Sequence, residues 1–140
     1  MIVADTGAIL AMIDKKDRHH AAFQTAYDAH PGDWILPWAI LPEVDYLVTT
    51  RLGARTQETF LADLADGSFQ VEHGKAHDLI RAHEISRKHR ALHVGLVDAV
   101  VMAVAERLRA RAIATLDLRH FGAVTLAGSP LLIPRDEIQR

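Results

Sequence analysis

The chain has 140 residues, of which 49% are hydrophobic and 24% charged, and it contains no cysteine. These values fit one compact domain, and they exclude disulfides, thiolate metal sites and thiol nucleophiles. The formal net charge of −2 does not by itself predict a nucleic-acid partner, because a polyanion needs local basic patches or bound cations. The N-terminus lacks a basic region, and no apolar stretch approaches the roughly 20 residues of a membrane helix, so we expect a cytoplasmic protein without membrane contact.

The first half of the chain alternates between short strand patterns and helical patterns. Apolar and β-branched runs predict strands, whereas longer segments with apolar residues at helical spacing predict helices. Gly53 and the pair Asp66-Gly67 end helical patterns, and Pro42 is tolerated because it falls in a first turn. The expected elements are a strand at 2–4, helices at 8–13 and from 17 to about 30, a strand at 34–36, helices at 39–52 and 56–65, and a strand at 69–71.

The second half contains the most apolar helical segment of the chain. Residues 96–105 are apolar nearly all round apart from Asp98, which predicts a largely buried helix. The expected elements are a helix from 75 to about 90, a helix at 96–109, a central strand at 112–115 and an edge strand at 131–133. Strands that alternate with helices predict an α/β fold, a three-layer α/β/α sandwich on a central parallel sheet, in a single domain over residues 1–140.

Four carboxylates stand where a domain of this kind normally places apolar side chains. Asp5 ends the first strand and Asp117 lies just past a later one, so a parallel sheet would bring both to its carboxyl edge, where open α/β sheets bind ligands. Glu43 opens a helix, and Asp98 is embedded in an apolar one. Because an unpaired buried charge is strongly unfavourable, like charges gathered there require a cation.

The available ligand types indicate which cation this would be. Carboxylate oxygens without cysteine favour hard cations such as Mg²⁺ or Mn²⁺ over zinc. The nine histidines show no HExxH or paired spacing, so we expect no histidine metal site and place most of them at the surface. A divalent ion held by carboxylates keeps several waters and binds phosphate oxygens. The acids therefore predict phosphodiester hydrolysis with Mg²⁺ or Mn²⁺ as cofactor.

Each acid also has a structural interpretation. Asp5 is suited to cap the following helix, a role compatible with metal binding. Glu43 could merely favour the positive end of its helix, and its neighbour Asp45 competes for the inward-facing position. Asp117 fits a turn after a strand. Asp98 is the hardest to explain structurally, because so apolar a helix leaves little solvated face for a charge.

Four motifs carry these acids and their neighbours along the chain. They are Ile2-Val3-Ala4-Asp5-Thr6-Gly7-Ala8, Pro42-Glu43-Val44-Asp45-Tyr46-Leu47, Gly95-Leu96-Val97-Asp98-Ala99 and Ala114-Thr115-Leu116-Asp117-Leu118-Arg119-His120-Phe121. In this order and spacing the chain resembles the PIN domain family, and within it the VapC-type ribonuclease toxins of bacterial type II toxin–antitoxin pairs. The resemblance covers essentially the whole chain.

The resemblance implies an endoribonuclease that hydrolyses RNA with a metal-activated water and without a side-chain nucleophile. It implies Mg²⁺ or Mn²⁺ bound most directly by Asp5 and Asp98, with Glu43 and Asp117 completing the acidic pocket. It further implies a homodimer and a small cognate antitoxin protein. Two alternatives stay open: an inert PIN-like module that only binds RNA or protein, and a PIN-type structure-specific DNA nuclease.

Further residues are expected around the acids. Thr6 and Thr115 match polar positions of the family that border the pocket, and Arg119 and His120, beside Asp117, are the best candidates for substrate contact. Basic residues elsewhere could contact phosphates, although charged helix faces are usually only solvated. They are Arg51, Arg55, the run Arg87-Lys88-His89-Arg90, and Arg107, Arg109 and Arg111. Trp34, Trp38, Tyr46 and Phe60 could form an apolar interface, although such residues more often belong to a core.

Overall fold

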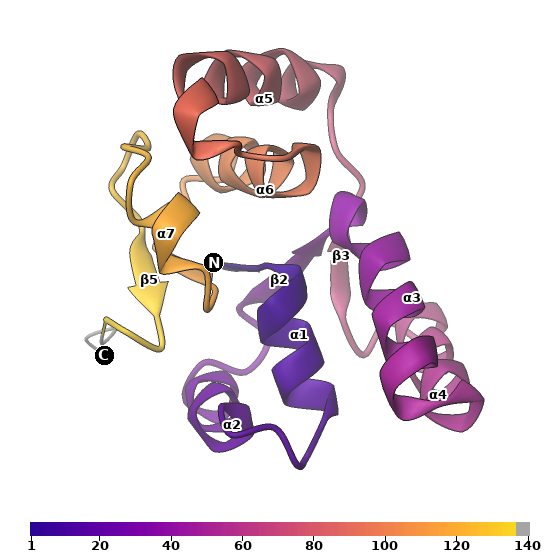
Figure 1. The fold of residues 1–140 in the computed structure, drawn as a ribbon. Coiled ribbons are helices and arrows are strands. Elements are labelled where there is room, and N and C mark those ends of the chain that lie inside the picture. Colours follow the sequence, from indigo (N-terminus) through magenta and orange to yellow (C-terminus); the bar gives the residue numbers. More distant parts are fainter. Residues whose placement is uncertain (137–140) are drawn as a thin grey trace.

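The structure is a computed structural model that describes residues 1–136. Its centre is a five-stranded sheet with helices on both sides (Figure 1). The elements are, in chain order, β1 (Ile2–Ala4), α1 (Thr6–Ile13), α2 (His20–Ala29), β2 (Trp34–Pro37), the 3₁₀ turn η1 (Trp38–Ile40), α3 (Leu41–Leu52), α4 (Ala54–Ala65), β3 (Gln70–Glu72), α5 (Ala76–Lys88), the 3₁₀ turn η2 (Arg90–Leu92), α6 (Leu96–Arg107), β4 (Ala112–Ala114), α7 (Leu118–Phe121) and β5 (Leu131–Ile133).

The sheet has the strand order β3-β2-β1-β4-β5, and all its strand pairs are parallel. Every residue of β1, β2 and β4 is buried, as is typical of parallel strands that helices cover on both faces. In the register of β1 and β4, Ala4 lies opposite Ala114. The carboxyl ends of these two central strands therefore meet at the same edge of the sheet.

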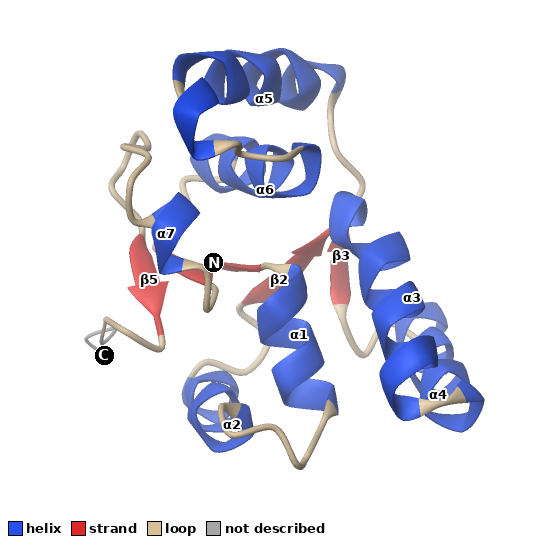
Figure 2. Cartoon of the chain, viewed as in Figure 1, coloured by secondary structure: helices blue, strands red, loops and turns tan. Residues whose placement is uncertain are grey.

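Helices cover the sheet on both faces. Figure 1 shows α5 and α6 stacked on one side, α1 and α2 on the other, and α3 with α4 beside β3, and the colouring of Figure 2 shows the strands enclosed between these helices. The helix α6 packs against β1 and β2, and every residue from Ala99 to Ala105 is buried. The predicted three-layer α/β/α sandwich on a parallel sheet is confirmed.

Most expected helices agree with the structure to within two residues at each end, and the larger differences concern α2, α3 and α7. The helix α2 begins at His20 rather than Asp17, because the Asp17 carboxylate accepts a hydrogen bond from His19 N (2.7 Å) and so caps the turn before the helix. The segment expected as one helix at 39–52 divides into η1 and α3. The sequence does not predict α7, because four residues are too few to show a helical period.

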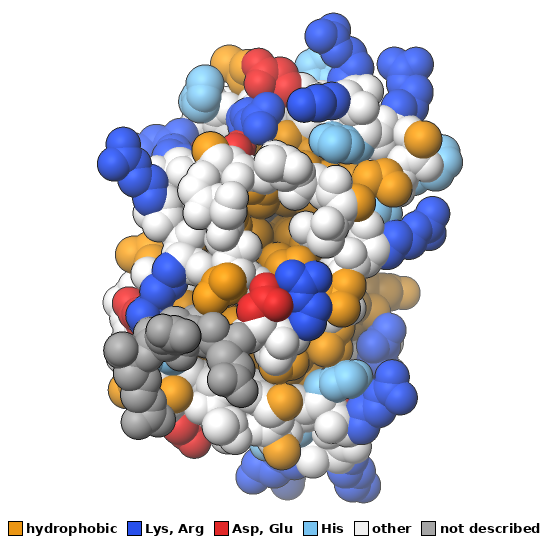
Figure 3. All heavy atoms as spheres, turned by 90° about the vertical axis from the view of Figure 1, so that its left-hand side faces the viewer, with side chains coloured by type: hydrophobic (Ala, Val, Ile, Leu, Met, Phe, Trp, Pro, Cys, Tyr) orange, Lys and Arg blue, Asp and Glu red, His pale blue; other side chains and the backbone are white. Residues whose placement is uncertain are grey.

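The surface carries a basic region over α5. In Figure 3, Lys, Arg and His side chains gather at the top of the molecule, over this helix. In the part of the chain that the structure describes, no helix has both the length and the apolar character of a membrane span. Residues 137–140, which the predicted single domain includes, lie outside the described residues.

Candidate active site

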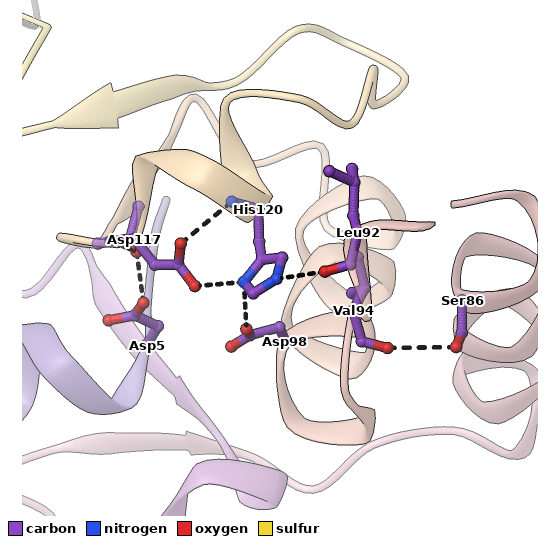
Figure 4. A network of polar contacts seen from close by, with 8 residues as sticks. Asp5, Ser86, Leu92, Val94, Asp98, Asp117 and His120 are labelled. Carbon is purple, nitrogen blue, oxygen red and sulfur yellow. Dashed lines mark hydrogen bonds and ion pairs between the residues drawn. The ribbon is translucent and has the colours of Figure 1, made fainter. Parts of the chain in front are cut away.

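The acids that the sequence singles out converge at the carboxyl edge of the sheet. Asp5 follows β1 directly, and its backbone N–H donates to Ala114 O of β4 (3.0 Å), which keeps the two strand ends side by side. Asp117 lies just past β4 as the cap of α7, and Asp98 lies in the first turn of α6. Figure 4 shows the side chains of Asp98 and Asp117 beside the ring of His120, with Asp5 on the far side of Asp117.

Asp5 is a buried carboxylate without a basic partner in the described chain. Only 5% of the residue is exposed. Its Oδ1 accepts a hydrogen bond from Ala8 N (3.0 Å), so it does cap α1, and its Oδ2 accepts one from the Thr115 hydroxyl. Burial raises the pKa of Asp5 to about 6 despite these two bonds, and the charges of Asp98 and Asp117 raise it further. The capping role leaves this carboxylate electrostatically unsatisfied.

Asp117 and His120 form a pair on the single turn of α7. Asp117 Oδ1 accepts a hydrogen bond from His120 N (3.0 Å), and the ring Nδ1 of His120 lies 2.7 Å from Asp117 Oδ2. The Thr115 hydroxyl, besides donating to Asp5, accepts from Asp117 N (3.0 Å). Burial alone would raise the pKa of Asp117, but the bonds and charge of His120 outweigh it and lower this pKa. The pair thus fixes the Asp117 carboxylate in its ionised form.

The second nitrogen of His120 determines the charge of the ring. Nε2 lies 2.7 Å from the backbone oxygen of Leu92, and because a carbonyl can only accept, Nε2 carries a hydrogen. Nδ1 can then donate to Asp117 only if the ring is an imidazolium. The hydrogen bonds to Asp117 and Leu92 accordingly raise the pKa of His120. This arrangement places a positive charge between the carboxylates of Asp98 and Asp117.

Asp98 lies across the His120 ring from Asp117. Its Oδ2 is 3.6 Å from His120 Nδ1, and 28% of its side chain is exposed. Burial and the charge of Asp117 raise the pKa of Asp98 to about 6, Glu43 adds to the rise, and the charge of His120 opposes it. One ligand atom from each of Asp98, Asp117 and His120 lies within 4.8 Å of the others. The two carboxylates could share a cation at this spacing, whereas His120 could join them as a ligand only after it loses the Nδ1 proton.

The structure distinguishes Glu43 from its neighbour Asp45. Both lie on α3, but Asp45 Oδ1 accepts a hydrogen bond from Gln57 Nε2 of α4 (2.9 Å) and so faces the neighbouring helix. Glu43 is exposed, and its charge acts on Asp98. The geometry therefore favours Glu43 over Asp45 as the fourth acid of the cluster.

The other expected neighbours take different positions. Thr6 is buried directly after Asp5, and its hydroxyl oxygen has no hydrogen-bond partner among the described residues, which is uncommon for a buried polar atom. Arg119 is exposed on α7, where its backbone N–H helps to lower the pKa of Asp117. Of the two residues expected to contact substrate, only His120 has its side chain inside the cluster.

Sequence reasoning placed His120 at the rim of the site and expected no histidine among the metal ligands. One signal could have placed His120 inside the cluster: it follows Asp117 by three residues, a spacing that brings the two side chains together on one helical turn. The contact with Leu92 O could not be inferred, because it joins residues 28 positions apart.

Comparisons with known proteins agree with this architecture. The family model of the PIN domain matches residues 2–125. The chain is 33% identical over 127 residues to "Ribonuclease VapC26" of Mycobacterium tuberculosis, a match that covers 91% of this chain and 94% of that protein.

Solved structures share the fold at lower identity. VapC20 of Mycobacterium tuberculosis, described as a sarcin-ricin loop cleaving toxin, has a TM-score of 0.78 at 21% identity, covering 89% of this chain and 97% of that one. A toxin–antitoxin complex from Klebsiella pneumoniae gives 0.73 at 16% identity, covering 99% and 100% of the two chains. The family match spans most of the sequence and includes all four acids, as the sequence resemblance implied. The chain belongs to the PIN domain family.

Proposed function

We propose that this chain is a metal-dependent endoribonuclease and the toxin of a type II toxin–antitoxin pair. The observation that carries the proposal is the convergence of Asp5, Asp98 and Asp117 at the carboxyl edge of the sheet, where burial and the neighbouring acids raise the pKa values of Asp5 and Asp98 to about 6. The relative that is 33% identical over nearly the whole chain is named a ribonuclease, which supports this chemistry. We further propose that the whole chain acts as a single domain in the cytoplasm.

A divalent cation suits the donors of the cluster. Asp5, Asp98 and Asp117 offer carboxylate oxygens, with Glu43 at the margin, and such oxygen ligands favour Mg²⁺ or Mn²⁺. The unpartnered hydroxyl of Thr6 lies beside Asp5 and is available to order a water or a substrate oxygen. When bound, such a cation would polarise water, orient the phosphodiester and neutralise developing charge.

The chain's own side chains would orient the acids for a cation. The Thr115 hydroxyl orients the Asp5 carboxylate, and His120 orients that of Asp117. His120 also holds a proton at Nδ1 that balances the acids before a cation binds. Arg119 is exposed beside Asp117 and is our candidate for contact with the RNA phosphates.

The proposed protein partners are a small antitoxin and a second copy of the chain. Trp34 and Phe60 are buried in the core, whereas Trp38 and Tyr46 are 54% and 67% exposed and remain available for contact. Leu96, at the start of α6, is likewise 67% exposed close to Asp98. Apolar side chains next to a site are typical of contact surfaces, and the structural neighbour solved as a toxin–antitoxin complex supports a partner of this kind.

The decisive experiment compares Asp98→Asn with Asp45→Asn. The first change removes charge from the cluster at nearly constant volume, so we expect it to abolish Mg²⁺- or Mn²⁺-dependent cleavage of RNA while the protein stays folded. Asp45→Asn keeps an oxygen for Gln57 and should retain activity. Cleavage is assayed on total RNA and on a sarcin-ricin loop hairpin, with duplex DNA as the competing substrate.

Several results would contradict the proposal. They are full activity of folded Asp98→Asn, cleavage that persists in EDTA, binding of RNA without cleavage, and cleavage of duplex DNA alone. In cells, expression of the chain should arrest growth, and co-expression of the adjacent reading frame should rescue it. Absence of both effects would separate the nuclease from a toxin role.

A further inference from the structure

A basic pocket lies at the end of α5, outside the acidic cluster. It is a cavity of about 450 Å³ lined by His83, Ser86, Arg87, Arg90, His93 and Val94. These residues come from α5, from η2 and from the segment before α6, so the pocket is concave rather than one face of a solvated helix. It belongs to the region over α5 where Lys, Arg and His side chains gather in Figure 3.

The charge of this pocket contrasts with that of the whole chain. The formal net charge of the protein is −2, yet between His83 and His93 three Lys and Arg residues face one acid, Glu84. Glu84 lies 3.3 Å from Arg81 and is already paired. Within residues 1–136, neither of the two pocket arginines forms an ion pair. Two exposed guanidinium groups are thus free to bind an anion in a concave site.

The basic pocket is tied directly to the acidic cluster. The backbone oxygen of Leu92 accepts the hydrogen bond from His120 Nε2 (2.7 Å), and two residues later Val94 lines the pocket and accepts a bond from the Ser86 hydroxyl (3.2 Å). Figure 4 shows these contacts as one row from Asp5 to Ser86. Even a fully extended chain spans at most about 7 Å over two residues, so the carbonyl that holds His120 lies next to a wall of the pocket.

We infer that the basic pocket binds a backbone phosphate of the same RNA strand that enters the acidic cluster. This inference rests on the proposed nuclease function. An acidic cluster repels a polyanion, and the metal can offset that repulsion only at the phosphate it contacts; a neighbouring phosphate needs its own cations. Guanidinium groups match phosphate oxygens with paired hydrogen bonds, and the histidine rings add donors. The pocket contributes to binding, so its loss should raise KM rather than lower kcat.

The test is the salt dependence of RNA binding by the full chain. In an Asp98→Asn background, which prevents cleavage, fluorescence anisotropy follows a labelled single-stranded RNA of about 12 nucleotides, within the range of common site sizes. Arg87→Gln/Arg90→Gln should bind more weakly and reduce the slope of log K against log salt by about 0.7, the value for one lost phosphate contact on a single strand. Arg87→Lys/Arg90→Lys keeps both charges and should restore the slope.

A matched control carries the same charge change away from the pocket. Lys15 and Lys16 are exposed in the turn between α1 and α2, and their double change to Gln should leave the slope at its original value. Circular dichroism checks that all variants are folded, which exposed positions favour. Equal slopes for the pocket variant and the control would overturn the inference.

Other occupants give distinguishable results. Inorganic phosphate could shift the NMR signals of the His83 and His93 rings while the pocket variant keeps the original salt slope for RNA. That result would assign the pocket to free phosphate and overturn the inference. Loss of antitoxin binding with an unchanged RNA slope would assign it to a protein partner, with the same consequence.

The experiment also separates the two proposals. If the wild-type protein never cleaves RNA, the proposed function is contradicted. If the pocket variant still cleaves RNA with unchanged KM and salt slope, only the inference about the pocket is rejected.

Discussion

Asp5 and Asp78 are almost equally buried, with 5% and 3% of each residue exposed, but their surroundings are opposite. Asp78 on α5 accepts two hydrogen bonds from Arg107 of α6, from Nε (2.8 Å) and Nη2 (2.9 Å), and one from Lys75 N (2.8 Å). Burial alone would raise the pKa of Asp78, but Arg107 outweighs it and holds this pKa below its usual value. Asp5 has no such partner, and burial raises its pKa to about 6.

The difference separates a structural acid from the acid that we propose to be functional. Arg107 also bonds Glu72 at the end of β3 (2.6 Å), so its pairs hold α6, α5 and the sheet together with their charges balanced. The acidic cluster balances its carboxylates only in part, through one imidazolium. Burial alone therefore does not indicate a site, whereas a buried acid without a matching basic partner is a candidate for one.

The largest expected effect contrasts Asp5→Asn with Asp78→Asn. Asp5→Asn removes a proposed ligand of the cation, so RNA cleavage should fall by about 100-fold or more, the upper range for weakened metal sites. Because the change also removes a charge that burial disfavours, the folded protein should not lose stability. Asp78→Asn leaves Arg107 with half its partners and should lower the free energy of unfolding by about 2–3 kcal/mol while the folded protein still cleaves. Cleavage rates and urea unfolding measure both. The comparison fails if Asp78→Asn inactivates the folded protein or Asp5→Asn unfolds it.

A smaller effect is expected for His120→Gln. Gln can still donate to an oxygen but supplies no positive charge, so the Asp117 carboxylate loses its orientation and partial neutralisation. We expect the Mn²⁺ concentration for half-maximal cleavage to change by about tenfold, within the range for residues that orient metal ligands. A metal titration measures this, with His77→Gln at an exposed position of α5 as control. An unchanged titration would show that His120 neither orients nor binds the ligands of the cation.

The sequence predicts the acidic-cluster side of this comparison, but not the side of Asp78 and Arg107. The strand at 2–4, the parallel sheet and the buried α6 follow from apolar periodicity, and Asp98 is conspicuous because it interrupts an apolar segment. The partnership of Arg107 with Asp78 is not visible in the sequence, because the residues are 29 positions apart and meet only when α5 packs on α6. Asp78 looks like any helix acid.

The same limit applies to the details of the site. The choice between Glu43 and Asp45 depends on the rotation of α3 against α4, which places Asp45 beside Gln57. The basic pocket needs the turn at His93, whose φ of 52° is left-handed and uncommon for a residue other than glycine. Local patterns predict which residues are unusual, and tertiary packing decides which of them meet.

The smallest effect concerns the pH dependence of stability without metal. Asp5 and Asp98 have folded-state pKa values of about 6, above the ordinary 3.8, so the folded protein binds more protons than the unfolded chain between these values. Their contribution to stability is thus present below about pH 4 and is lost as the pH rises through about 6, whereas Asp78, with its lowered pKa, loses its contribution as the pH falls.

Between pH 5 and 7 the free energy of unfolding of the metal-free protein should fall by on the order of 1–2 kcal/mol, and Mn²⁺ should abolish or reverse this slope by neutralising the ionised acids. Thermal unfolding in EDTA and in Mn²⁺ measures the slopes. In Asp98→Asn the EDTA slope should be shallower, and a metal-free stability that rises from pH 5 to 7 would mean that the cluster is already balanced without a cation.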